Sequence, residues 1–140
     1  MNEPGQQRWH RAAILLGLVY FAAGMTFGAL AGGASSSQMR VSWRLLAWLI
    51  SGVAFAAHIA YEHFRLRSSA VRTASHASLA AGLGAFGLAA AANIHAQASG
   101  SSHQGMLALS LVLWPVLTGV PAFVVALGAA GLLGLRRRGV

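Results

Sequence analysis

Four long runs of apolar residues dominate the chain, and short stretches rich in Ser, Gly or Arg separate them. The runs cover approximately residues 12–33, 45–64, 75–97 and 106–135. A transmembrane helix needs about 20 apolar residues to cross a hydrocarbon core of about 30 Å, and each run meets that length. We therefore predict an all-α integral membrane protein in which residues 1–140 form a single domain, a bundle of four transmembrane helices.

Two other interpretations of the apolar runs fit the sequence less well. Arg8 and Arg11 precede the first run, and Ala29-Leu30-Ala31 has the form of a signal-peptidase site, so a cleaved signal peptide is one alternative. The apolar part of a signal peptide usually has only about 7–15 residues, and this run is longer. Buried helices of a water-soluble protein would need amphipathic outer helices around them, and the chain has none.

The composition also favours lipid as the solvent of this chain. Apolar residues make up 56% of the sequence and charged residues only 9%, whereas an ordinary soluble domain has about 25% charged residues. The net charge of +8 could suit nucleic acid, but the basic residues stand in short clusters between apolar runs, so we expect no nucleic-acid partner. The absence of Cys excludes disulfides, thiolate metal sites, Fe–S clusters and Cys nucleophiles.

The distribution of arginine predicts the orientation of the bundle. With four spans, the first terminus, the second connector and the last terminus share one side. That side carries eight arginines, which are Arg8, Arg11, Arg65, Arg67, Arg72, Arg136, Arg137 and Arg138. The other side carries Arg40 and Arg44. The positive-inside rule then places both termini in the cytoplasm, and we expect a bacterial-type inner or plasma membrane.

Small residues form stripes along two of the predicted helices. Gly24, Gly28 and Gly32 repeat the GxxxG motif in the first, and Gly84 and Gly87 share a face of the third with Ala80 and Ala91. Between helices in lipid, small residues permit close backbone contact. We interpret both stripes as packing surfaces, with contacts inside the chain favoured over contacts between subunits.

Two prolines interrupt the fourth apolar run. Pro115 and Pro121 each remove a backbone hydrogen bond from a helix interior. We therefore expect this helix to bend at these positions, as a fixed kink rather than as a moving hinge.

The second predicted helix carries the most informative polar residues. Ser51, His58 and Glu62 fall on one face, within about 60° of one another and in line with Arg65. Glu62 is the only carboxylate in any of the runs, and an ionisable residue in a membrane is a functional hypothesis by default. We take His58, Glu62 and Ser51 as the candidate polar or ligand-binding centre. The alternative is that Glu62 pairs with Arg65 and only anchors the end of the helix.

Histidine chemistry leaves two further alternatives open. His58 and Glu62 could supply two ligands to a metal ion, which His63 or His76 would complete. Haem b between histidines of facing helices is the other possibility that a four-helix membrane bundle offers. His63 and His76 share a depth but lie near the surface, and His58 has no evident partner at its own level.

Catalytic motifs are weak in this sequence. The chain contains no Asp, so a Ser/His/Asp triad cannot form. The segment 82–87 matches G-x-G-x-x-G, but it lies inside an apolar run with no preceding strand. We predict no catalytic residue and expect that the protein is not an enzyme.

These observations lead to one expected function and two alternatives. The first expectation is a small non-catalytic multi-pass membrane protein, an accessory, assembly or structural subunit whose partners are the lipid bilayer and other membrane subunits or itself. One alternative is an electron-transfer bundle that binds haem or a metal through His58 and nearby histidines. The other is a small proton-coupled transporter that uses Glu62.

Overall fold

The computed structural model describes residues 4–100 and 104–138 of the chain, and this part of the chain is helical with no strand. Its helices are α1 (Pro4–Gly32), α2 (Ser37–Phe64), α3 (Ala70–Ala98) and α4 (Gln104–Arg138). All four are long and apolar enough to cross a membrane. The all-helical prediction with four candidate spans is therefore confirmed.

Two helices begin earlier than the apolar runs suggested, because serine caps stabilise polar first turns. α2 starts at Ser37 rather than near Leu45, and the side chain of Ser36 accepts a hydrogen bond from the backbone N–H of Met39 at 3.1 Å. α3 starts at Ala70, and Ser69 accepts from the N–H of Arg72 at 3.4 Å. A side-chain oxygen at this position satisfies one of the N–H groups that a helix start leaves unpaired.

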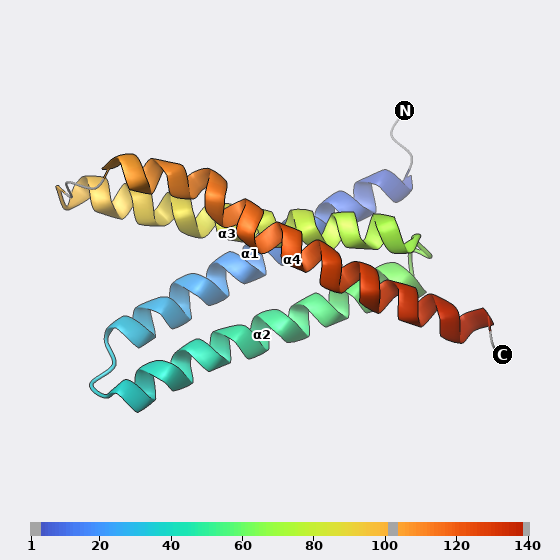
Figure 1. Ribbon diagram of the computed structural model, residues 1–140, viewed down its shortest axis with the longest axis horizontal. Coiled ribbons are helices and arrows are strands. Elements are labelled where there is room, and N and C mark those ends of the chain that lie inside the picture. Colours follow the sequence, from blue (N-terminus) through green and yellow to red (C-terminus); the bar gives the residue numbers. More distant parts are fainter. Residues whose placement is uncertain (1–3, 101–103, 139–140) are drawn as a thin grey trace.

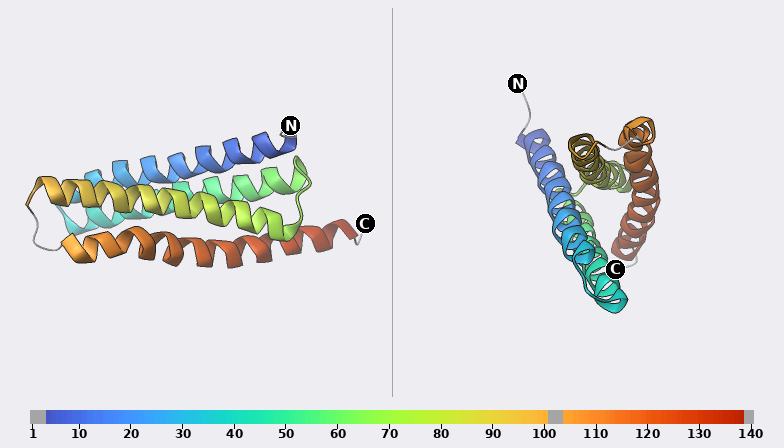
Figure 2. Two further views of the ribbon diagram at one scale, coloured as in Figure 1. Left: turned by 90° about the horizontal axis from the view of Figure 1, so that it is seen from above. Right: turned by 90° about the vertical axis from the view of Figure 1, so that its left-hand side faces the viewer.

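The helices form two hairpins that meet at one end and diverge at the other. α1 pairs with α2, α3 pairs with α4, and α1 crosses α3, while α1 and α4 do not touch within the described residues. Figure 1 shows the hairpins close together near the α2–α3 turn and apart at the α1–α2 and α3–α4 turns, and the right-hand view of Figure 2 shows the same divergence. We call the end with Arg11, Arg65, Arg67 and Arg72 the Arg-rich end, and the other the far end.

Small side chains make up most of the interior. One cluster joins Ile59 of α2 to alanines of α3 and α4, and a second joins Ala13 and Leu16 of α1 to Ala80 of α3. Large apolar side chains such as Trp48 point outward and are exposed along all four helices. Helices in lipid pack in this way, because lipid already solvates large apolar groups and close contact favours small ones.

The glycine stripes divide into positions that pack inside the chain and positions that do not. A Cβ atom at Gly24 would lie 2.6 Å from Cδ1 of Leu88, one at Gly84 2.6 Å from Cβ of Tyr20, and one at Gly87 2.8 Å from Cδ2 of Phe21. Gly28 and Gly32 have no such neighbour within 4 Å. The expected internal packing is thus corrected for Gly28 and Gly32, because the hairpins have already separated at that height.

The fourth helix stays continuous at both prolines. α4 runs from Gln104 to Arg138 through Pro115 and Pro121. The expected bend at these two positions stays a prediction. α3 and α4 lie close together near Pro115, since a Cβ atom at Gly82 of α3 would lie 3.7 Å from the carbonyl oxygen of Pro115.

Candidate functional site

Glu62 is fully buried in the last turn of α2 and is bound by side chains outside that helix. Its Oε1 lies 3.0 Å from Nδ1 of His76 on α3, and its Oε2 accepts a hydrogen bond from Oγ of Ser68 at 2.7 Å. An ionised carboxylate only accepts hydrogen bonds, so Nδ1 of His76 is the donor when Glu62 is charged. Arg65 is exposed and is no partner of Glu62, so the alternative pairing with Arg65 does not form.

The α2–α3 turn places Ser68 on the carboxylate. The backbone N–H of Ser68 donates to the carbonyl of Glu62 at 3.1 Å, while its hydroxyl binds the side chain of the same residue. Arg67 precedes it with φ of 52°, a left-handed conformation that few non-glycine residues adopt. This turn therefore folds back over the end of α2 and covers Glu62 from the Arg-rich end.

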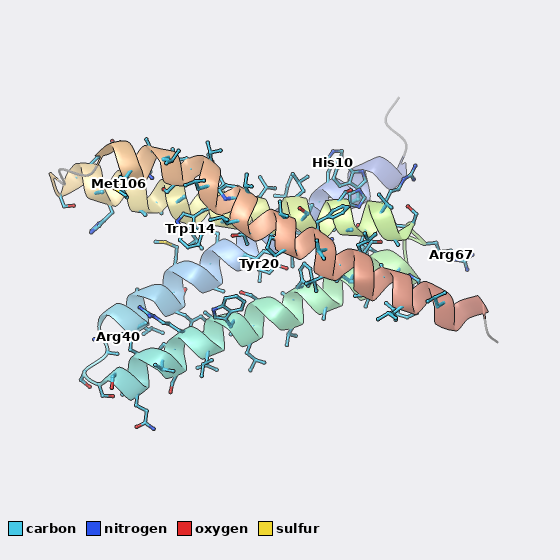
Figure 3. The ribbon with its side chains drawn as sticks, viewed as in Figure 1. His10, Tyr20, Arg40, Arg67, Met106 and Trp114 are labelled. Carbon is cyan, nitrogen blue, oxygen red and sulfur yellow. The ribbon has the colours of Figure 1, made fainter. Side chains whose placement is uncertain are left out.

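His76 also connects the carboxylate to α1. The ring of Trp9 stacks on the ring of His76, with ring centroids 4.1 Å apart and an angle of 4° between the planes. Trp9 also stacks on the ring of His10, with centroids 3.7 Å apart. Figure 3 places His10 and Arg67 at the same end of the molecule, opposite Arg40 and Met106. Through this stack and the hydrogen bond to Glu62, three helices meet in one polar cluster.

His58 lies one helical turn deeper than Glu62 and is also buried. Its Nε2 is 4.0 Å from Oε1 of Glu62, which is beyond hydrogen-bond distance, and has no hydrogen-bond partner. The hydroxyl of the fully buried Thr73 on α3 has no partner either. Buried polar atoms are nearly always hydrogen-bonded in folded proteins, so each of these two atoms is an exception.

The other predicted site residues do not join this cluster. Ser51 is half-buried two turns before His58 and gives no hydrogen bond to the cluster. His63 is buried, but its ring meets the edge of Phe64 at 5.0 Å. Among the described residues, no group of three or more His or Glu side chains has the arrangement to hold a metal ion.

Sequence reasoning missed Ser68 and Trp9 as members of the cluster. Ser68 stands in a five-residue connector, and only the fold of that connector brings its hydroxyl to Glu62. Trp9 precedes the first apolar run, and no pattern in the sequence pairs it with His76. His76 was named only as a metal candidate, and its role as the hydrogen-bond partner of Glu62 depends on the register of α3 against α2.

A second buried polar residue joins α3 to α4 near the far end. The side-chain amide of Asn93 donates to the carbonyls of Ala89 and Leu107, both at 2.8 Å, and lies 3.3 Å from the hydroxyl of Ser110. The sequence signal was available, because an amide inside an apolar run needs partners on a neighbouring helix. Because the amide nitrogen of Asn93 has partners on both helices, we interpret this residue as a structural link between α3 and α4.

The cluster around Glu62 consists of its carboxylate, the imidazoles of His58 and His76 and the hydroxyl of Ser68, which are groups that bind and exchange protons. A shallow open hollow lies elsewhere, beside the α1–α2 turn at the far end, and is lined by residues that include Ser36, Met39 and Trp43.

Comparisons with protein-family models, with curated proteins and with solved structures find no match for this chain.

Proposed function

We propose that the protein is a small non-catalytic membrane subunit that assists the assembly of a membrane complex. In this proposal all four helices cross a bacterial-type plasma membrane, with the Arg-rich end and both termini in the cytoplasm. The eight-to-two distribution of arginine supports that orientation, because positive residues are retained on the cytoplasmic side.

The observation that carries the proposal is a set of glycines on helix faces that no other helix covers within the described part of the chain. A Cβ atom would meet no other group within 4 Å at six of them, which are Gly28, Gly32, Gly52, Gly128, Gly131 and Gly134. Glycine in a helix interior is unfavourable relative to alanine by about 1 kcal/mol in water. Positions that carry this cost without an internal contact are suited to close contact with a helix from another molecule.

Gly28 and Gly32 on α1 are the best-placed pair. They are one turn apart on the same face, which is the spacing of a GxxxG contact. They lie in the half of α1 where the two hairpins have diverged, and a Cβ atom at either position meets no described group of another helix within 4 Å. We assign this face to a transmembrane helix of another subunit in the complex.

A crosslinking experiment in native membranes tests this assignment. A photoreactive amino acid in place of Ala29, which is exposed beside Gly28, should form a discrete adduct with a membrane protein. The double variant Gly28→Leu, Gly32→Leu should lose the adduct, because leucine side chains hold the helices apart, and should keep the thermal stability of the isolated chain. Gly52→Leu is the matched control, since Gly52 is equally uncovered but lies on α2.

Two results would contradict the proposal. The first is an adduct at Ala29 that contains only lipid. The second is a protein adduct that persists unchanged in the double variant, because the contact would then not depend on the glycines. An adduct with a second copy of this chain would support the assembly role and would identify the protein itself as the partner.

A further inference from the structure

The buried cluster at the Arg-rich end contains a third titratable group, His58, besides the pair of Glu62 and His76. Glu62 and a protonated His76, joined at 3.0 Å, would cancel each other's charge. His58 is additional. Its Nε2 is buried without a partner at 4.0 Å from Oε1 of Glu62, so the nitrogen faces a carboxylate that it does not yet bind.

The geometry around His58 favours a very small ligand. No set of three metal-ligating side chains is formed in the described part of the chain, and the side chain of His58 is only 4% exposed. A proton requires no cavity. Once Nε2 carries it, a shift of about 1 Å would turn the 4.0 Å separation into a charge-assisted hydrogen bond to Glu62.

We infer that His58 and Glu62 form a proton-binding site. The proton comes from hydronium in the water at the Arg-rich end, which loses one O–H bond and leaves as water, and the lone pair of Nε2 of His58 forms the new N–H bond. The carboxylate of Glu62 balances the charge of the new imidazolium. No electron is transferred and no other reactant is needed.

Apart from Glu62, the titratable groups that α2, α3 and the turn between them place around the site are histidines and exposed arginines. On α2, His63 is buried next to Glu62 in sequence, and Arg65 is exposed; on α3, His76 contacts Glu62, and Arg72 is exposed. Arg67 in the turn is exposed.

The other two helices complete this account. On α1, Arg11 is exposed, Tyr20 is half-buried, and His10 stacks on Trp9. The described side chains of α4, residues 106–135, contain no titratable group. Glu62 is thus the only described carboxylate that His58 can use as its counter-charge.

His76 provides a route from water to the buried pair. Its side chain is 14% exposed, against 0% for Glu62 and 4% for His58, and it touches Glu62 directly. Exposure therefore falls from His76 to the buried pair. A proton can pass from His76 to Oε1 of Glu62 and from there to His58, all from the Arg-rich end.

Nitrogen NMR of the full chain in lipid nanodiscs tests the inference directly. With ¹⁵N-labelled histidine, the ring signals of His58 should change from neutral to imidazolium form as the pH falls from about 8 to about 5, the range in which histidine changes charge. In Glu62→Gln the change at His58 should be lost, because no carboxylate balances the charge. His95→Asn, at the exposed far end of α3, is the control and should leave the His58 signals as in the wild type.

Infrared spectroscopy supplies a second measurement that does not depend on the folding of Glu62→Gln. The only acidic side chains of the chain are Glu3 and Glu62, so Glu3→Gln leaves one side-chain carboxylate. Its symmetric and antisymmetric stretches should shift as His58 gains its proton and the hydrogen bond to Glu62 forms. A His58 ring that stays neutral throughout the range with an unchanged carboxylate band would overturn the inference, as would wild-type titration of His58 in a folded Glu62→Gln variant.

Discussion

Gly17 and Gly84 bring the backbones of α1 and α3 into direct contact where the two hairpins cross. A Cβ atom at Gly84 would lie 3.1 Å from the carbonyl oxygen of Gly17, and one at Gly17 would lie 3.2 Å from that of Ala80. Backbone atoms cannot move aside as flexible side chains can. This crossing therefore fixes how closely the hairpins approach, and helix divergence begins beyond it.

Replacing Gly84 with alanine should destabilise the bundle. The added methyl group would meet Cβ of Tyr20 at 2.6 Å as well as the backbone of Gly17, and overpacking of this kind typically costs about 1–3 kcal/mol. Unfolding in detergent by heat or by SDS titration measures the loss. Gly28→Ala is the control, because the same methyl group meets nothing there. Equal stability of the two variants would refute the close crossing.

Replacing His76 with alanine should weaken the junction of α1, α2 and α3. The change removes the hydrogen bond to Glu62 and the stack on Trp9, and a hydrogen bond to a charged group contributes about 1.5–3 kcal/mol. The loss can be measured by the same unfolding assays. His95→Ala, an exposed position on the same helix, should be close to neutral. The prediction fails if both variants unfold like the wild type.

Replacing Arg67 with glycine should stabilise the α2–α3 turn. The left-handed conformation at φ 52° costs an L-residue about 1–2 kcal/mol, whereas glycine adopts it readily. A higher unfolding temperature in detergent is expected. Arg72→Gly removes the same charge within the first turn of α3 and should lower stability, because glycine disfavours helix. A destabilised Arg67→Gly would show that the guanidinium group matters more than the backbone.

Replacing Asn93 with leucine should loosen the α3–α4 hairpin near the far end. Two hydrogen bonds to backbone carbonyls are lost, one of them across to α4, and a hydrogen bond between membrane helices is worth about 0.6 kcal/mol on average. Faster amide exchange around Leu107 would detect the change. Gln97→Leu, at an exposed position one turn later, should leave exchange at Leu107 unaltered. Unchanged exchange in the Asn93 variant would argue against the contact.

The proposed orientation can be tested with single cysteines, since the chain has none. A membrane-impermeant maleimide added to intact cells should label Ser35→Cys in the exposed α1–α2 turn and should not label Val140→Cys. Both positions should react after the cells are lysed. The opposite labelling pattern would reverse the orientation inferred from the arginines.

The elements of this fold could be predicted from the sequence, whereas their mutual arrangement could not. Run length alone identified four helices, because the length and hydrophobicity of a helix are local properties. The angle between the hairpins is not local. As a result, Gly24 and Gly28 looked equivalent in the repeated motif, although only Gly24 packs inside the chain.

The candidate site divides in the same way. The spacing of four placed His58 and Glu62 on one face, and both are buried next to each other. The partners of Glu62 on other segments could not be predicted from the sequence. The contact with His76 depends on the position of α3 beside α2. The contact with Ser68 requires a left-handed backbone conformation at Arg67, and arginine does not prefer that conformation as glycine does.

The enclosure of Glu62 among histidines has an electrostatic consequence for the surface outside it. The one described carboxylate faces inward, so Arg65, Arg67 and Arg72 remain on the surface without a counter-ion from the described part of the chain. Their field extends about 8–10 Å at physiological salt. Phosphate groups of anionic phospholipids are the negative charges that a membrane surface offers at that distance. In the membrane arrangement that we propose, these arginines should therefore enrich such lipids around this rim, and raised ionic strength should disperse them.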